Sequence, residues 1–252
     1  MTKKLRFSLI LIYCLAISCL FVPFIKQVLI IYRTQNVSIQ TSETIRAAKD
    51  VPLEAVQPPD LSDVLEFKQR QSFDSTGQIV IPGIEISLPL FSGVVNDQLL
   101  VGAGTLFPER NPEKQNMVVI GHHLGQNNLL FGKLLDVAVG DAIYLEYQNQ
   151  FYQYRVNQTQ TIQQTELHVL ENRSKAEITL ITCDKPTHTE QRFVVKGRLV
   201  TPVKGIKHKA MQQRRLIETK NQQRNLTYCI VVMLLFLVSL VIGIRIITKI
   251  SK

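Results

Sequence analysis

The stretch from residue 178 to 195, ITLITCDKPTHTEQRFVV, contains two apolar segments joined by a polar loop. Both segments, Ile178 to Thr182 and Arg192 to Val195, are rich in β-branched and aromatic residues, which predicts two central strands. Cys183 ends the first predicted strand, and Arg192 begins the second. If the two strands pair, Arg192 returns beside Cys183 at the rim of a sheet.

Other segments of the chain also read as short strands. Residues 84–90 alternate between apolar and polar, and Pro89 predicts an edge position for that strand. Residues 142–147 and 151–156 alternate on either side of Gln148, Asn149 and Gln150, which predicts a hairpin. Many short strands with few helices favour a mostly β fold closed into a barrel.

A third position at the rim is predicted by the apolar run Met117 to Ile120. This run is followed by Gly121 and then by His122 and His123, so both histidines lie where a strand gives way to a loop. A cysteine attacks a carbonyl only as a thiolate, and the developing oxyanion needs a charged or polar donor. Cysteine, histidine and arginine together meet these needs.

The cysteine usage singles out one thiol. Cys14, Cys19 and Cys229 lie in apolar terminal runs, so Cys183 is left without a disulfide partner in the middle of the chain. A free thiol in an oxidising exterior is a liability unless it is used. A nucleophile and a buried, inert cysteine both fit this observation.

Uncharged runs of membrane-spanning length lie at both ends, at residues 7–24 and 227–244. We favour an uncleaved anchor over a signal peptide for the first run, because no small-x-small cleavage pattern follows it. The alternative to two membrane spans is that both runs form apolar helices docked into a soluble protein. Basic residues before the first run and after the second predict cytoplasmic termini and an extracellular middle.

The net charge of +9 does not come from the middle of the chain. Residues 35–203 contain 14 Lys and Arg against 19 Asp and Glu, so this part is acidic. The excess positive charge lies in the flanks, which argues against nucleic-acid binding and favours proximity to a membrane.

The segment Thr179 to Cys183, TLITC, resembles the TLxTC signature of sortases, with Gly121-His122 upstream and Arg192 downstream in the family's order. The resemblance covers residues 78–203. Residues 102–105, 130–131 and 166–171 are similar to class A sortases of Gram-positive bacteria.

This resemblance implies an eight-stranded sortase-type β-barrel with short helices. It implies an enzyme that cleaves an LPxTG-like sorting signal between Thr and Gly, holds the threonine as a thioester on Cys183 and transfers it to an amine, usually of lipid II. His122 would be the acid and base, and Arg192 would stabilise the tetrahedral intermediate. Thr182 and His123 would be auxiliary residues.

The resemblance further suggests substrate binding by Thr105, Ile120 and Ile181. It implies no cofactor, although some members bind calcium, for which the candidate carboxylates here are Glu109, Glu113 and Glu171. The remaining histidines match no motif, and we interpret them as surface residues. They are His168, His188 and His208.

Together these observations predict a protein of the cell membrane with its catalytic domain outside. The predicted segments are an N-terminus with a membrane anchor (1–33), a stalk with a helix over residues 60–70 (34–77), the catalytic barrel (78–203), a basic solvated tether (204–226) and a second membrane helix with a cytoplasmic tail (227–252). Contact of the tether with anionic lipid headgroups or wall polymers stays open.

Three alternatives remain. A second membrane helix is typical of the pilin-polymerising class C sortases, but those carry a lid with an Asp-Pro-aromatic plug, and Pro58-Pro59-Asp60-Leu61 has no aromatic residue. We therefore favour class A-like wall anchoring. A non-catalytic, membrane-tethered binding module and a hydrolytic cysteine peptidase are the other two.

Overall fold

The computed structural model describes residues 3–35, 37, 39–41, 56, 59, 66–67, 72–124, 129–173, 175–200 and 204–250. It divides into two compact units, one of residues 34–221 and one that combines residues 1–33 with 222–252. Most of the predicted stalk helix over residues 60–70 lies outside the described residues.

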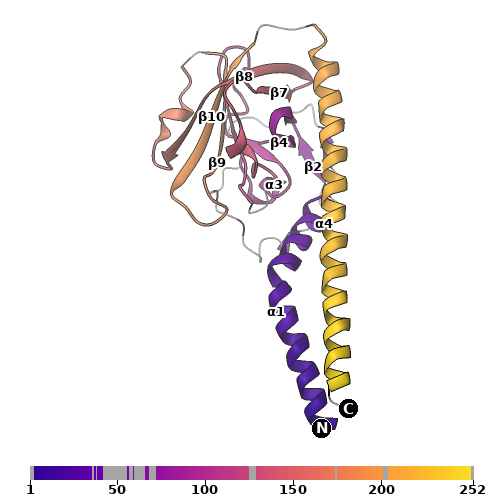
Figure 1. Cartoon of the computed structure of the whole chain (residues 1–252). Coiled ribbons are helices and arrows are strands. Elements are labelled where there is room, and N and C mark those ends of the chain that lie inside the picture. The colour runs from indigo at the N-terminus through magenta and orange to yellow at the C-terminus, as the bar shows by residue number, and fades with distance from the viewer. Residues whose placement is uncertain are drawn as a thin grey trace. The chain divides into compact units, whose positions relative to one another are not determined.

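The first unit contains a closed barrel of eight strands among its described residues, as the sequence predicted (Figure 1). Around the barrel the order is β10-β8-β7-β3-β4-β5-β6-β9. The strands are β3 (Gly77–Ile81), β4 (Ile86–Ser92), β5 (Ala103–Thr105), β6 (Asn116–Ile120), β7 (Ala142–Tyr147), β8 (Gln150–Gln163), β9 (Glu177–Cys183) and β10 (Gln191–Leu199).

Short elements connect the strands or accompany the barrel. The connections contain η2 (Pro82–Ile84), α3 (Asn96–Leu99), η3 (Leu134–Asp136) and η4 (Leu167–Leu170). Two further strands, β1 (Ile39–Thr41) and β2 (Phe73–Ser75), form a separate parallel pair. The barrel interior is filled by one apolar cluster that includes Ile79, Leu145 and Leu180, all fully buried.

The predicted hairpin is present as β7 and β8, whose turn residues Gln148 and Asn149 both have positive φ. That conformation matches the right-handed twist of the flanking strands. The edge position predicted from Pro89 is wrong in a closed barrel. Pro89 is paired with Gln78 of β3, but β5 pairs with β4 only from Leu90 onward, so the missing N–H of Pro89 interrupts no pair between β4 and β5.

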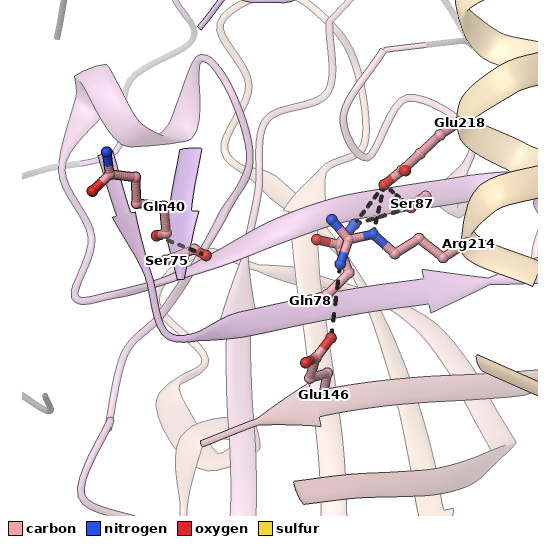
Figure 2. Close-up of polar contacts among 7 residues, drawn as sticks. All are labelled: Gln40, Ser75, Gln78, Ser87, Glu146, Arg214 and Glu218. Atoms are coloured by element: carbon pink, nitrogen blue, oxygen red, sulfur yellow. Dashed lines mark hydrogen bonds and ion pairs between the residues drawn. The ribbon is translucent and has the colours of Figure 1, made fainter. Parts of the chain in front are cut away.

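The segment after the barrel, predicted as a solvated tether, is helical; most of its side chains are exposed, but part of it packs on the barrel. It begins α4 (Ile206–Ile250), and its Ala210 and Ile217 pack against Val80 and Tyr144 on the outer face of β3 and β7. Figure 2 shows Arg214 of this helix between Glu218 and Glu146. Its guanidinium lies 2.9 Å from the carboxylate of Glu218 and 3.8 Å from that of Glu146. Part of the basic charge of this segment is therefore paired with an acidic residue of the barrel.

The second unit consists of α1 (Lys3–Gln35) up to residue 33 and the part of α4 from residue 222 onward. By length and composition, both helices are candidate membrane spans. They pack on each other through the hydroxyl of Tyr13, which donates to the carbonyl of Ser239 at 2.7 Å, and through an edge-on contact of Phe21 with Phe236. Gly243 leaves room for the ring of Tyr13.

Candidate active site

The parallel pairing of β6 with β9 places His122 alongside Cys183. Ile120 is the partner of Ile181, and the amide of Gly121 donates to the carbonyl of Ile181 at 3.1 Å. His122 lies two residues after Ile120, and Cys183 lies two residues after Ile181. Neighbouring strands are about 4.8 Å apart, so the two residues end adjacent chain segments at the same end of the barrel.

The antiparallel pairing of β9 with β10 places Arg192 directly opposite Cys183. Residues directly opposite each other project from the same face of a sheet. Two residues further along the same strands, Val194 is paired with Ile181, and both belong to an apolar cluster separate from the barrel interior. Cys183 and Arg192 therefore lie on the outer face.

The burial of the histidine and the cysteine determines their charge states. His122 is 2% exposed, and desolvation lowers its pKa to about 4. Cys183 is 6% exposed, and desolvation raises its pKa, although the positive charge of Arg192 acts in the opposite direction. At neutral pH both groups therefore favour their neutral forms.

Arg192 is held by the loop that precedes it. Its guanidinium donates to the carbonyls of Thr189 and Gln191 at 2.8 and 3.0 Å and to Oε1 of Gln164 at 2.9 Å. The loop is itself closed by the hydroxyl of Thr189, which donates to Asp184 at 2.7 Å. Sequence reasoning missed Gln164, since it lies far from the motif along the chain and only the pairing of β8 with β10 brings it near.

The two auxiliary residues join the strand ends to each other. Thr182, 1% exposed, donates its hydroxyl to the carbonyl of Gly121 at 2.8 Å. Nδ1 of His123 lies 3.0 Å from the carbonyl oxygen of Cys183, and because a carbonyl only accepts, this nitrogen carries the proton. Both bonds connect the histidine segment to the cysteine strand.

The three residues suggested for substrate binding separate into two groups. Ile120 and Ile181 belong to the outer apolar patch, which we define as Val118, Ile162, Val169, Ile181 and Val194 with the partly exposed Leu106, Phe107, Ile120 and Leu170. Thr105 is fully buried opposite Val119, a residue of the interior core, so the structure does not bring it to this patch.

The remaining candidates lie elsewhere. His168 belongs to η4, His188 to the loop before β10 and His208 to α4, and all three are exposed. Among the described residues, no three His, Cys, Asp or Glu side chains gather in a group that could hold a metal ion, and this includes Glu109, Glu113 and Glu171.

Comparison with known proteins shows which family this chain resembles. The family model described as "Sortase domain" matches residues 79–200. The chain is 34% identical over 197 residues to sortase A of Listeria monocytogenes, spanning 75% of this chain and 89% of that protein. It is 32% identical to sortase A of Bacillus anthracis, spanning 58% of this chain and 69% of that protein.

A solved structure is similar as well. The crystal structure of Listeria monocytogenes sortase A matches with a TM-score of 0.51 at 38% identity, covering 54% of this chain and 96% of that one. The matched part of this chain therefore accounts for nearly the whole of that structure.

Proposed function

The chain belongs to the sortase family of cysteine transpeptidases, and from this we propose that it cleaves an LPxTG-like sorting signal between Thr and Gly and joins the new carboxyl end to an amine of lipid II. One observation carries the proposal. The register of β6, β9 and β10 brings Cys183 between His122 and Arg192 at one end of the barrel.

In the first half of the proposed reaction, the sulfur of Cys183 attacks the threonine carbonyl and the imidazole of His122 receives the thiol proton. Arg192 donates hydrogen bonds to the oxyanion of the tetrahedral intermediate. The C–N bond then breaks, and His122 returns the proton to the departing glycine amine. The products are a thioester on Cys183 and a free amine.

In the second half, the acceptor amine attacks the thioester carbonyl and loses its proton to His122. The C–S bond breaks, an amide forms and the thiol of Cys183 recovers the proton. Since burial holds both Cys183 and His122 neutral at pH 7, the thiolate and imidazolium pair is a minor form of the free enzyme. Turnover is therefore expected to be slow.

The outer apolar patch supports the choice of peptide. Ile120 and Ile181 lie two residues before His122 and Cys183. The part of the patch that solvent reaches is formed by Ile120 with Leu106, Phe107 and Leu170, above the buried Val118 and Val194. In an extended LPxTG peptide the leucine lies about 10 Å from the threonine. An apolar surface that begins about two residues from the nucleophile suits the Leu-Pro side of the signal.

We propose that the two candidate membrane spans anchor the enzyme with its barrel outside the cell. Lipid II, a membrane-bound amine, would then be accessible to the thioester. The second helix also favours a second candidate function, the class C-like joining of pilin subunits, in which the acceptor amine is a lysine side chain.

The test uses the full chain in detergent micelles, an LPxTG peptide and either triglycine, a lysine-containing pilin peptide or no amine, with product masses as the readout. We expect an amide with triglycine, and none of these products with Cys183→Ala. Preference for the pilin peptide would support the class C-like role. A product with a free carboxylic acid, whichever amine is added, would indicate a hydrolase. An absence of cleavage would indicate a non-catalytic binding module.

The same assay with EDTA or with calcium tests whether a metal is required. We propose that none is, because three protein side chains supply the nucleophile, the proton transfer and the oxyanion donor. A loss of activity in EDTA that calcium restores would contradict this.

A further inference from the structure

Two polar side chains, Arg110 and Asn116, bind three consecutive carbonyls of the connection between β8 and β9. Nη1 of Arg110 donates to the carbonyl of Leu170 at 2.9 Å. Nδ2 of Asn116 donates to the carbonyls of Val169 and Glu171 at 3.1 and 3.2 Å. We call this pair the carbonyl clamp. The connection spans residues 164–176 and contains η4.

The clamp is itself fixed in place. Asn116 is 2% exposed, and its Oδ1 accepts a hydrogen bond from the fully buried Thr179 at 2.8 Å, which orients its amide nitrogen toward the connection. Arg110 also donates to the carbonyl of Asn116 at 2.9 Å, and its guanidinium stacks 3.6 Å above the ring of Phe107. Both donors are therefore held before any ligand arrives.

The bound carbonyls belong to residues that form part of the outer apolar patch. Val169, 2% exposed, and Leu170 pack there with Val118, Ile181 and Val194. Ile181 lies on the strand that ends at Cys183. Without the clamp, three carbonyls would lack these donors, and the connection that carries Val169 and Leu170 would be free to leave the patch.

We propose that Arg110 and Asn116 are positioning residues that hold the β8–β9 connection as a wall of the peptide-binding surface and so determine the selectivity for leucine in the sorting signal. This inference rests on the proposed function. A wall ordered in advance removes the entropy cost of ordering it when the peptide binds. The clamp therefore acts on KM and on selectivity, while the thiol chemistry at Cys183 is left unchanged.

The decisive variants are Asn116→Asp and Arg110→Gln in the full chain. Asn116→Asp is nearly isosteric and keeps an acceptor for Thr179, but it turns a carboxylate oxygen toward two carbonyls. Arg110→Gln removes both bonds of the guanidinium, whereas Arg110→Lys keeps one donor and should retain part of the function. Arg155→Gln is the matched control, because Arg155 also donates to a loop carbonyl, that of Gly140 at 2.8 Å, away from the patch.

Three measurements are made on each protein. For cleavage of LPxTG and APxTG peptides, we expect Asn116→Asp and Arg110→Gln to raise KM for the leucine peptide about tenfold and to lower the leucine-to-alanine ratio of kcat/KM. The alkylation rate of Cys183 should stay within about twofold of the unmodified protein. Amide hydrogen exchange of residues 164–176 should accelerate. Arg155→Gln should change none of the three.

The results that overturn the proposal are distinct from failure of the proposed function. An unchanged leucine-to-alanine ratio, or a loss confined to kcat with slower alkylation, would assign the clamp a purely structural role. Unchanged exchange of residues 164–176 would overturn the clamp itself. If the unmodified protein cleaves neither peptide, the substrate assignment fails, while faster exchange in the two variants would still support the clamp.

Discussion

At the scale of single residues, the burial of His122 has a consequence for stability. The unfolded chain binds a proton on this histidine near pH 6.5, whereas desolvation holds the pKa of the folded residue at about 4. As the pH falls through this window, the unfolded state gains a proton that the folded state does not. We therefore expect the free energy of unfolding to decrease between pH 6.5 and 4, by at most about 3 kcal/mol from this residue.

Urea unfolding at several pH values checks this expectation, with near-UV circular dichroism of the tyrosines as the signal. The control is His122→Gln, which cannot titrate, so other groups that ionise in the same range cancel in the comparison. The unmodified protein should lose more stability on acidification than the variant. Parallel losses in the two proteins would show that the folded state protonates this histidine as readily as the unfolded state.

The guanidinium of Arg192 is predicted to be irreplaceable by an ammonium. Three hydrogen bonds, to Thr189, Gln191 and Gln164, hold it opposite Cys183. The single ammonium of a lysine cannot keep those partners and also reach an oxyanion. We expect Arg192→Lys to lower kcat/KM about 100-fold.

Alkylation separates this effect from damage to the nucleophile. Since Arg192 opposes the rise in the pKa of Cys183, the alkylation rate of Arg192→Lys should fall, but by less than about tenfold. Arg198→Lys, at an exposed position of the same strand, should resemble the unmodified protein. Equal losses of alkylation and turnover would assign the role of Arg192 to thiol activation alone.

Residues whose positions follow from a local motif could be predicted, whereas residues held by distant partners could not. Cys183 and Arg192 each stand at the end of a recognisable strand, and His122 follows a third. Gln164 and Asn116 carry no such signal, because their partners are brought close only by strand pairing and by the path of the β8–β9 connection.

At the scale of elements, the contact of α4 with the barrel should depend on its apolar residues more than on its ion pairs. Ile217 is 5% exposed and packs toward Val80 and Tyr144. Arg214 is partly exposed and lies 3.8 Å from Glu146. We expect Ile217→Asp to destabilise the barrel by about 2–4 kcal/mol and Arg214→Ala by less than about 1 kcal/mol.

Thermal unfolding of the full chain measures both effects. Leu216→Asp is the matched control, since the neighbouring Leu216 is 59% exposed and the same charge there removes little packing. If Leu216→Asp and Ile217→Asp unfold at the same temperature, this part of α4 does not contribute to the stability of the barrel.

This element also shows why the packing of residues 204–226 on the barrel could not be predicted. Residues 204–226 contain many charges and few apolar residues, a composition typical of a solvated segment. Ala210 and Ile217 are two turns apart, which is too sparse a pattern to predict a packed helix face. In contrast, the β7–β8 hairpin was predicted because alternation and turn signal lie within one short stretch.

At the scale of the whole molecule, the closed barrel could be predicted as a class, but its strand order could not be predicted from periodicity. The parallel pairing of β6 with β9 joins segments about 60 residues apart and brings His122 to Cys183. No local pattern encodes a contact of that range. The strand pattern predicted that His122 and Cys183 both lie at a rim, but only the family resemblance, which carries the order of the motifs, implied that they lie side by side.

The distribution of charge around the two apolar helices leads to a prediction about the membrane. Basic residues lie at the N-terminal end of α1 and at the C-terminal end of α4, and basic residues next to membrane spans are retained in the cytoplasm. They are Lys3, Lys4, Arg6, Arg245, Lys249 and Lys252. The side-by-side packing of α1 and α4, through Tyr13 and Ser239, is compatible with a hairpin whose two ends are on the same side.

Labelling of intact cells with a membrane-impermeant thiol reagent tests this topology. The four native cysteines are first replaced, and single cysteines are then introduced as Thr2→Cys, Ser251→Cys or Lys204→Cys. We expect Lys204→Cys to be labelled in intact cells, and the two terminal cysteines to be labelled only after lysis. Labelling of Ser251→Cys alone in intact cells would mean that α4 does not return to the cytoplasm. Labelling of Thr2→Cys in intact cells would mean that the N-terminus lies outside the cell. Either result would show that the basic flanks do not determine the orientation of the enzyme.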